Sequence, residues 1–365
     1  MRNRKIMFVI HALGYGGAGK MIVYLANQLS KVGYECVIYV EEQVGKHYEV
    51  EANVEIIQET EFFKNYYTRH FQQIFQLRRR VKEINPDLVI SFQTNQNALS
   101  VLATRGRSIP VIVSERGDPY QYNNVVAKLK TAVINKAEGS VFQTKKAMEY
   151  YGKKLQERST VIYNPCTVPY VPAPAWEERR NEIAFVARFD IQQKRQDLMI
   201  QAFAIVAKKN PELRLAFYGE GKEMKQIQQM AESLGVSDRV DFKGLVRDIP
   251  NAIRNAKMFV MTSDYEGLPN ALIEAMAVGL PCVSTDCSPG GAAELIVSGE
   301  NGVIVPCGDV DRLANCILEV INDPKCAYKY GKKAQEIADT LHPQKIYSQW
   351  EKYIKSIMGE DNKND

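Results

Sequence analysis

The sequence predicts an α/β protein made of two doubly wound domains, and three observations lead to this fold class. The chain has 365 residues, more than one ordinary hydrophobic core accommodates and enough for two domains. In both halves, short runs rich in β-branched residues alternate with stretches whose apolar residues recur at helical spacing. A proline-rich stretch separates the halves. We therefore expect two parallel sheets, each covered by helices on both faces.

The first half begins with a strand, a glycine-rich loop, a helix and a second strand. The strands are expected over 5–12 and 35–40, and the apolar residues of 18–32 have helical spacing. Further strands are expected over 87–92, 110–115, 139–144 and 159–164, and a helix over 73–84. Because these runs are almost continuously apolar, they are typical of strands buried on both faces. Residues 1–168 are therefore predicted to form the N-terminal domain.

The pattern breaks at 164–181, where four prolines stand close together, so we expect a hinge over 169–181. The alternation then restarts in a C-terminal domain predicted over 182–340. Its expected strands are 182–189, 213–221, 239–244, 258–263 and 281–286, and its expected helices are 196–209, 223–235, 270–279 and 309–322. Residues 341–365 should form an amphipathic helix that packs back on the N-terminal domain. Two such domains would place a ligand cleft between the carboxyl ends of their sheets.

Composition bounds the class of protein. Hydrophobic residues make up 45% and charged residues 25% of the chain, as in soluble globular proteins and unlike disordered chains. No apolar run approaches the roughly 20 residues of a membrane span, and the apolar start leads into glycines like a first strand, unlike a signal peptide. We expect a cytoplasmic protein. Seven cysteines without CxxC spacing argue for reduced thiols and against a disulfide framework or zinc site.

The charge is unevenly distributed. Residues 1–170 carry 23 Lys and Arg against 15 Asp and Glu, whereas the remainder is acidic. A basic half suggests an anionic neighbour, such as a membrane surface or a phosphorylated substrate, although a merely soluble surface would look the same.

The glycine cluster GYGGAGKM, residues 14–21, nearly matches the P-loop pattern of nucleotide triphosphatases. Gly14, Gly19 and Lys20 satisfy that pattern, but Met21 stands where a Ser or Thr hydroxyl holds Mg²⁺. The cluster is either an altered ATPase loop or a loop that approaches another phosphate. Lys20 either contacts that phosphate or begins a solvated helix face.

Two further segments carry charged residues that could face the expected cleft. In EGLPNALIE, Glu266 follows a strand, Glu274 lies in the next helix, and the helix start near Asn270 offers free N–H groups to a phosphate. Acidic residues beside an anion site make sense if they accept hydrogen bonds from sugar hydroxyls; alternatively, they are ordinary helix-start residues. Arg188 ends another strand, and Lys194 ends the turn that follows it. Two cations held in place there could neutralise a diphosphate without a metal.

The ordered set GYGGAGK, VARFDIQQKR, YGEG, GLVRDIP and EGLPNALIEAMAVGLPCVST resembles the retaining glycosyltransferases of family 4 over nearly the whole chain. The resemblance implies the GT-B fold, in which two Rossmann-like domains face each other across a cleft. Within the family, the chain looks most similar to bacterial enzymes of polysaccharide and lipid-linked oligosaccharide synthesis, including N-acetylgalactosaminyltransferases.

The resemblance also implies a role for each matching position. Arg188 and Lys194 would hold and stabilise the departing diphosphate, Glu266 would contact the donor sugar, and Glu274 would hold the ribose hydroxyls. The remaining donor-side positions would line sugar, phosphate or base mainly through backbone: Gly16, Gly17, Gly219, Gly221, Val246, Arg247, Gly267, Leu268, Pro269 and Asn270.

The acceptor side is where the chain departs from many relatives, which carry a His in the segment matching VSERGDPY. Here the segment has Arg116, flanked by Glu115 and Asp118, and we expect Arg116 or Asp118 to do related work near the acceptor. Asn95 is a fourth acceptor-side candidate. His11, at a strand end, has either a structural role or a role near the cleft.

A metal ion and a cofactor are not expected. Asp309 and Asp311 form an Asp-x-Asp pattern, but they open an amphipathic helix, where Asp309 should be the N-cap and Asp311 a first-turn residue.

The function implied is retaining transfer of a hexose or N-acetylhexosamine from a nucleotide diphosphate sugar, with UDP as the family expectation, to a glycan hydroxyl. The acceptor would be a polyprenyl-diphosphate-linked oligosaccharide in capsule, exopolysaccharide or glycan synthesis, reached by peripheral association with an anionic membrane; no nucleic acid is expected. A GT-B nucleotide-sugar 2-epimerase, a P-loop ATPase and a non-catalytic nucleotide-sugar-binding protein are the alternatives. The sequence leaves the sugar, the nucleotide, the linkage and the oligomeric state open.

Overall fold

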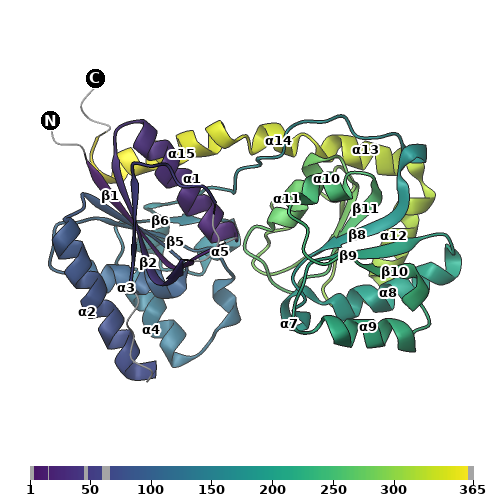
Figure 1. The fold of residues 1–365 in the computed structure, drawn as a ribbon, viewed down its shortest axis with the longest axis horizontal. Coiled ribbons are helices and arrows are strands. Elements are labelled where there is room, and N and C mark those ends of the chain that lie inside the picture. The colour runs from purple at the N-terminus through teal and green to yellow at the C-terminus, as the bar shows by residue number, and fades with distance from the viewer. Residues whose placement is uncertain (1–3, 15, 45–47, 60–65, 361–365) are drawn as a thin grey trace. The chain divides into compact units, whose positions relative to one another are not determined.

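The structure is a computed structural model that describes residues 4–14, 16–44, 48–59 and 66–360 (Figure 1). The chain divides into two compact units, which are Met1–Asn164 with Gln344–Asp365, and Pro165–Pro343. Each unit has one sheet whose strands all run parallel, so the predicted α/β class with two doubly wound sheets is confirmed.

The sheet of the first unit has seven strands in the order β3-β2-β1-β4-β5-β6-β7. Their bounds are β1 Lys5–Leu13, β2 Glu35–Val44, β3 Val54–Gln58, β4 Leu88–Phe92, β5 Val111–Ser114, β6 Gly139–Phe142 and β7 Ser159–Val161. The sequence predicted six of these strands and missed β3, a short edge strand. The helices are α1 Gly17–Lys31, α2 Tyr66–Ile84, α3 Thr94–Thr104, α4 Val125–Ile134, α5 Lys145–Glu149, α6 Lys153–Gln156 and α15 Pro343–Ile357, with a 3-10 turn over Pro119–Gln121.

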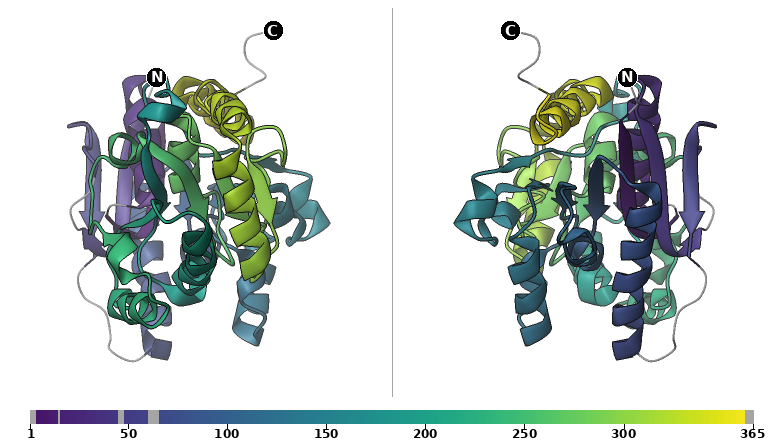
Figure 2. Two further views of the ribbon diagram at one scale, coloured as in Figure 1. Left: turned by 90° about the vertical axis from the view of Figure 1, so that its right-hand side faces the viewer. Right: turned by 90° about the vertical axis from the view of Figure 1, so that its left-hand side faces the viewer.

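Both faces of this first sheet are covered. Helices α2, α3 and α4 lie on one face (Figures 1 and 2). Because side chains alternate along a strand, Met7 and Val9 of β1 point to the same face, where they pack with residues of these helices. Helix α15 belongs to the same unit, since the ring of Trp350 stacks on Phe92 of β4 at a centroid distance of 6.1 Å. The buried strands therefore form a rigid platform whose carboxyl ends carry the loops.

The sheet of the second unit has six strands in the order β10-β9-β8-β11-β12-β13. Their bounds are β8 Arg180–Val186, β9 Arg214–Tyr218, β10 Val240–Phe242, β11 Ala256–Met261, β12 Cys282–Thr285 and β13 Val303–Val305. The helices are α7 Ile191–Lys194, α8 Gln196–Lys209, α9 Met224–Ser233, α10 Ile249–Ile253, α11 Asn270–Ala277, α12 Val310–Asn322, α13 Pro324–Ala334 and α14 Ile337–Thr340, with 3-10 turns over Trp176–Glu178 and Ser237–Arg239.

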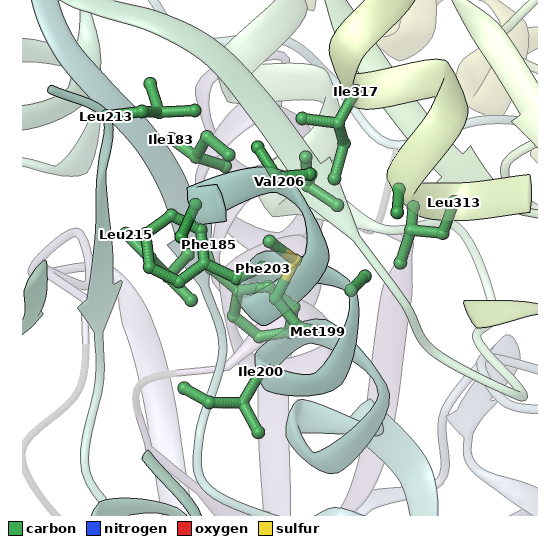
Figure 3. Close-up of a cluster of buried hydrophobic side chains, with 14 of the residues drawn as sticks. Ile183, Phe185, Met199, Ile200, Phe203, Val206, Leu213, Leu215, Leu313 and Ile317 are labelled. Atoms are coloured by element: carbon green, nitrogen blue, oxygen red, sulfur yellow. The ribbon is translucent and has the colours of Figure 1, made fainter. Parts of the chain in front are cut away.

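The core of the second unit lies between its sheet and helices α8 and α12 (Figure 3). Met199, Phe203 and Val206 recur at helical spacing along α8, so they share one face, and all three are fully buried. They pack with Phe185 of β8 and Ile317 of α12. This packing fixes β8 and α8, which flank the turn that carries Arg188 and Lys194.

Two whole-chain features complete the fold. Within the described residues, none of the helices combines the length and the apolar character that crossing a membrane requires. All seven cysteines are free thiols; five are buried, whereas Cys307 is exposed and Cys326 is half-buried.

Candidate active site

The carboxylate of Glu266 is held in place by two side chains. It lies in the loop after β11, where its Oε1 accepts hydrogen bonds from Nζ of Lys194 and, at 2.9 Å, from Oγ of Ser263. The backbone N–H of Glu266 donates to the carbonyl oxygen of Ser288 at 2.8 Å. The side chains of Lys194 and Glu266 are only 16% and 11% exposed, so water screens this ion pair weakly. The structure thus brings together two residues that lie 72 positions apart in the chain.

The turn after β8 carries both predicted cations. Helix α7 is a single turn, and Oδ1 of Asp190 caps it by accepting from the backbone N–H of Gln193 at 3.1 Å. The guanidinium of Arg188 is exposed, and its Nη2 donates to Oδ2 of Asp190 at 2.8 Å. Burial raises the pKa of Asp190, but the hydrogen bonds from Arg188 and from Gln193 outweigh it, so the pKa lies below the ordinary value. Asp190 is therefore a carboxylate, and it orients the guanidinium of Arg188.

Gln193 joins the two cations to the Glu266 loop. Its Nε2 donates to the carbonyl oxygen of Tyr265 at 3.0 Å, and its own carbonyl oxygen accepts from the N–H of Asp264 at 2.9 Å. These bonds link the turn after β8 to the loop after β11. Arg188, Lys194 and Glu266 consequently form one cluster at the carboxyl edge of the second sheet.

Sequence reasoning missed Arg195, which follows Lys194 directly. Its backbone has φ 51°, the left-handed region that non-glycine residues rarely adopt, and it links α7 to α8. The hydroxyl of Thr262 donates to the carbonyl oxygens of both Lys194 and Arg195 at 2.8 Å. The guanidinium pairs with Asp197 at 3.0 Å and with Asp264 at 2.9 Å. The acidic Asp197 two positions later is the only local pattern that could have indicated this clamp.

The helix that carries Glu274 starts beside this cluster. Asn270 begins α11 after Pro269, no side chain caps the helix, and its first turn contains no acidic residue. Glu274 lies in the second turn and is half-buried, Leu268 is buried, and Gly267 forms the turn between Glu266 and the helix. The expected donor-side positions 267–270 and 274 therefore follow Glu266 on one continuous loop and helix.

Sequence reasoning also missed Gly290 and Gly291, which support the turn at Gly267. A Cβ atom at Gly291 would collide with the carbonyl oxygen of Gly267, so only glycine allows the loop after β12 to pass this closely. The consecutive glycines at 290 and 291 were the available pattern in the sequence.

Gly219 and Gly221 have a packing role inside the second unit. Gly219 has φ +142°, and a Cβ atom there would collide with the carbonyl oxygen of Ala187; at Gly221 the collision would be with Phe189. These glycines let the turn after β9 lie against the backbone on both sides of Arg188. The N–H of Gly219 also donates to the carbonyl oxygen of Gly244 at 2.8 Å. Val246, half-buried, and Arg247, exposed, follow in the same loop after β10.

In the first unit, the glycine cluster leads from β1 into α1. Gly16 and Gly17 are exposed at the start of that helix, which no side chain caps, and Tyr15 lies outside the described residues. Met21 is 1% exposed and belongs to the core. The position that carries the Mg²⁺-binding hydroxyl in a P-loop is therefore a packing position here.

Two of the acceptor-side candidates, Glu115 and Asp118, make contacts that stabilise the first unit itself. Glu115 is buried and accepts hydrogen bonds from Thr94 at 2.9 Å and Tyr151 at 3.0 Å, and burial raises its pKa. Asp118 caps the 3-10 turn over Pro119–Gln121.

The guanidinium of Arg116 lies 4.7 Å from the ring centre of Phe92 and 5.7 Å from that of Trp350, as in cation–π contacts. Its Nη1 donates to Asn164 at 3.1 Å, and burial lowers the pKa of Arg116 to about 9. Arg116 therefore anchors α15 against β4.

Asn95 and His11 line a separate pocket at the carboxyl edge of the first sheet. Oδ1 of Asn95 accepts from Nζ of Lys130, and Nδ1 of His11 lies 3.3 Å from Oε2 of the fully buried Glu41. Of the four acceptor-side candidates, Asn95 alone lines this pocket.

Asp309 caps α12 as predicted, since its Oδ1 accepts from the N–H of Arg312 at 2.9 Å, and Asp311 stands in the first turn. Across the described residues, no group of three or more His, Cys, Asp or Glu is arranged to hold a metal ion.

Each of the two α/β units has a parallel sheet, and the second unit carries a cluster of basic and acidic residues at the carboxyl ends of its strands. This combination is typical of the GT-B class of glycosyltransferases. Family models agree with this assignment. The model described as "Glycosyltransferase Family 4" matches residues 15–168, and the model described as "Glycosyl transferases group 1" matches residues 170–337. The chain belongs to glycosyltransferase family 4.

Individual relatives match the chain over its whole length. A Campylobacter jejuni enzyme, named GalNAc-alpha-(1->4)-GalNAc-alpha-(1->3)-diNAcBac-PP-undecaprenol alpha-1,4-N-acetyl-D-galactosaminyltransferase, is 26% identical, and the alignment covers 97% of this chain and 99% of that enzyme. Among solved structures, Anabaena HepE in complex with UDP and glucose has a TM-score of 0.80 at 20% identity, covering 97% and 100% of the two chains. The lipopolysaccharide outer core galactosyltransferase WaaB has a TM-score of 0.79 at 20% identity, covering 96% and 99%.

Proposed function

We propose that this glycosyltransferase moves a hexose or N-acetylhexosamine from a UDP-sugar to a glycan hydroxyl, with retention at the anomeric carbon and without a metal ion. The observation that carries the proposal is the cluster of Arg188, Lys194 and Glu266 at the carboxyl edge of the second sheet. Two cations and one oriented carboxylate match the two halves of such a donor, because a diphosphate needs positive charge and a sugar needs hydrogen-bond acceptors.

The second unit is assigned to the donor. Arg188 and Lys194 bind the diphosphate, Glu266 accepts hydrogen bonds from sugar hydroxyls, and Glu274 accepts them from the ribose. The other donor contacts are assigned to Gly219, Gly221, Val246, Arg247, Gly267, Leu268, Pro269 and Asn270 of the second unit, and to Gly16 and Gly17 of the first unit. HepE has been solved with UDP and glucose, which supports a UDP-sugar as the donor.

In the proposed reaction, the acceptor hydroxyl attacks the anomeric carbon on the same face from which the diphosphate leaves. The bond from the anomeric carbon to the phosphate oxygen breaks, the bond to the acceptor oxygen forms, and the acceptor's proton passes to the departing phosphate oxygen. Arg188 and Lys194 stabilise the negative charge that develops there. Glu266 is already bonded to Lys194 and Ser263, so a binding role suits it better than that of a nucleophile.

The first unit is assigned to the acceptor, for which we propose a polyprenyl-diphosphate-linked glycan of capsule, exopolysaccharide or glycan synthesis. The name of the Campylobacter jejuni relative, which includes a PP-undecaprenol-linked glycan, supports this class. The basic first half of the chain agrees with peripheral association at the inner face of an anionic membrane.

A screen of nucleotide sugars for thermal stabilisation identifies the donor, since a ligand that binds only the folded state raises the melting temperature. Transfer of the radiolabelled sugar is then measured for the wild type and for Lys194→Ala. Loss of a group that stabilises transition-state charge should lower turnover by about 100- to 1000-fold. Lys243→Ala is the matched control and should retain turnover, because Lys243 is an exposed lysine that pairs with Asp241 in the same unit.

Near-normal turnover of Lys194→Ala would overturn the assignment of Lys194. The rival reaction, 2-epimerisation, is tested by incubating UDP-N-acetylhexosamines without acceptor. An epimer as the product would show that the enzyme is an isomerase and would overturn the proposed transfer, whereas slow hydrolysis or no reaction agrees with a transferase.

A further inference from the structure

The first unit has a pocket of about 450 Å³ that the donor chemistry does not use. Its walls come from the end of β1, the first turn of α3 and the first turns of α4. Its lining includes His11, Asn95, Gln96, Tyr122, Val126 and Lys130. All of them belong to the unit assigned to the acceptor.

One side of the pocket is cationic. Nζ of Lys130 donates to the neutral amide oxygen of Asn95, and no carboxylate among the described residues forms an ion pair with Lys130. Partial burial also lowers the pKa of Lys130. A partly desolvated ammonium beside a neutral amide favours an anionic ligand such as a phosphate.

The pocket wall also contains hydrogen-bonding groups that are held in fixed positions. Glu41 is fully buried, and its Oε2 accepts from Nε2 of Gln96 at 2.6 Å and lies 3.3 Å from Nδ1 of His11. Nε2 of His11 lies 3.2 Å from the carboxylate of Glu42. This network holds His11 and Gln96 in place at the wall of the pocket, and carboxylate, imidazole and amide groups suit sugar hydroxyls.

The outer surface of α4 is apolar, although it is exposed. Val125 is 73% and Leu129 62% exposed, and the pocket residues Val126 and Tyr122 are also exposed. Val125, Val126 and Leu129 are neighbours at helical spacing, and Lys128 and Lys130 border them on the two sides. Within 119–137 the chain has three lysines and no acidic residue. We call Val125, Val126 and Leu129 the α4 stripe.

We propose that the pocket and the α4 stripe together bind one amphiphilic acceptor, with a phosphate at Lys130, a sugar beside His11 and Gln96, and a hydrocarbon chain along the stripe. The inference rests on the proposed function and makes it more specific, because it assigns the lipid part of the acceptor to named side chains. A phosphate joined to a hydrocarbon chain meets the cation and the apolar stripe at the same time.

The probe is farnesyl diphosphate below its micellar concentration, titrated into the full-length protein with saturating UDP so that the donor site is filled. Inorganic diphosphate and farnesol are titrated in parallel. Farnesyl diphosphate should bind the wild type at least about tenfold more tightly than either half alone. Lys130→Ala and Leu129→Ser should each weaken it about tenfold, through loss of a charge-assisted hydrogen bond and of apolar burial.

Two substitutions serve as matched controls. Lys136→Ala removes an exposed lysine in the turn just after α4, and Val32→Ser removes an aliphatic side chain that is exposed just after α1. Neither should change the affinity for farnesyl diphosphate. Circular dichroism of each variant verifies that the fold is retained.

Several results would overturn the inference. Equal affinity for inorganic diphosphate means a free phosphate site, and equal affinity for farnesol means an apolar surface only. If Leu129→Ser releases the protein from phosphatidylglycerol vesicles but leaves farnesyl diphosphate binding unchanged, the stripe binds a bilayer. Stabilisation by UDP is measured on the same samples. If UDP stabilises the protein while farnesyl diphosphate does not bind, this inference fails and the proposed function stands; absence of stabilisation by any nucleotide diphosphate is evidence against the proposed function itself.

Discussion

Nη1 of Arg195 lies 2.9 Å from Oδ2 of Asp264 and thereby joins the turn that ends with Lys194 to the loop that carries Glu266. The left-handed backbone of Arg195 costs about 1 kcal/mol in a non-glycine residue. Ion pairs with Asp264 and Asp197 offset that cost and hold the turn. Arg195 is thus a positioning residue for Lys194.

Arg195→Gly should separate positioning from stability. Glycine adopts the left-handed backbone without strain, so the melting temperature should stay close to that of the wild type. Turnover should fall by roughly 10- to 100-fold with KM for the donor little changed, because Lys194 loses its fixed position relative to the reacting atoms. Steady-state kinetics with the identified donor measure both constants.

Arg214→Ala is the control for that variant. Arg214 pairs with Asp241 at 2.7 Å in the same unit, so its loss also removes an ion pair, but one far from the Lys194 turn in the chain. It should leave turnover unchanged. If Arg195→Gly behaves like this control, the clamp has no part in positioning Lys194.

The contact between Lys194 and Glu266 predicts strong coupling in a double-mutant cycle. Both side chains are mostly buried, so removing one partner leaves an uncompensated charge, and Lys194→Met or Glu266→Gln alone should cost about 3 kcal/mol of unfolding free energy. The double variant should cost much less than the sum of the two, because no unpaired charge is left behind. Urea unfolding of the four proteins measures the coupling, and additive costs would contradict a direct ion pair.

Local patterns predicted most of the fold because they describe strands that are buried on both faces. Residues 88–92 and 111–114 are apolar except for Ser91 and Ser114, and the structure confirms both strands, which are buried at every position. The missed strands, β3 and β13, are edge strands of five and three residues with partly exposed side chains, so neither alternation nor a long apolar run marks them.

The candidate site divides in the same way. Arg188, Lys194 and Glu266 stand in local motifs, so the sequence could identify them. The contacts of Arg195 with Asp264 and of Gly291 with Gly267 join distant segments, and no single-segment pattern encodes such contacts. Asn95 and Lys130 also come from different helices, so the sequence offered Asn95 without its partner.

Burial of Glu115 predicts a pH dependence of stability. Because its pKa is raised in the folded state, the folded protein binds this proton more tightly than the unfolded chain does. The stabilising effect of the proton is full below the unfolded pKa of about 4.3 and is lost as the pH rises toward the folded pKa. Unfolding free energy should therefore fall over that interval.

Glu115→Gln should remove this dependence and keep the fold. The amide oxygen of Gln can accept from the backbone N–H groups of Arg116 and Gly117, while its NH₂ group donates to the hydroxyls of Thr94 and Tyr151. The gain in stability over the wild type should be larger at pH 8 than at pH 5 in urea unfolding. Glu83→Gln, which changes an exposed carboxylate on α2, is the control, and its stability relative to the wild type should be the same at pH 5 and pH 8. The same result for Glu115→Gln would mean that the carboxyl of Glu115 has an ordinary pKa, contrary to the prediction.

Met21→Thr completes the P-loop pattern in the glycine cluster and thereby tests the ATPase alternative. Met21 is a buried residue of α1, so the exchange introduces a hydroxyl and a cavity, and unfolding free energy should fall by about 2–4 kcal/mol. Val32→Thr, at an exposed position just after the same helix, should change it by less than about 0.5 kcal/mol. Neither variant should hydrolyse ATP with Mg²⁺, because Met21 faces the core and not the open end of the loop. ATP turnover by Met21→Thr above the wild-type level would show that residues 14–21 retain a P-loop geometry.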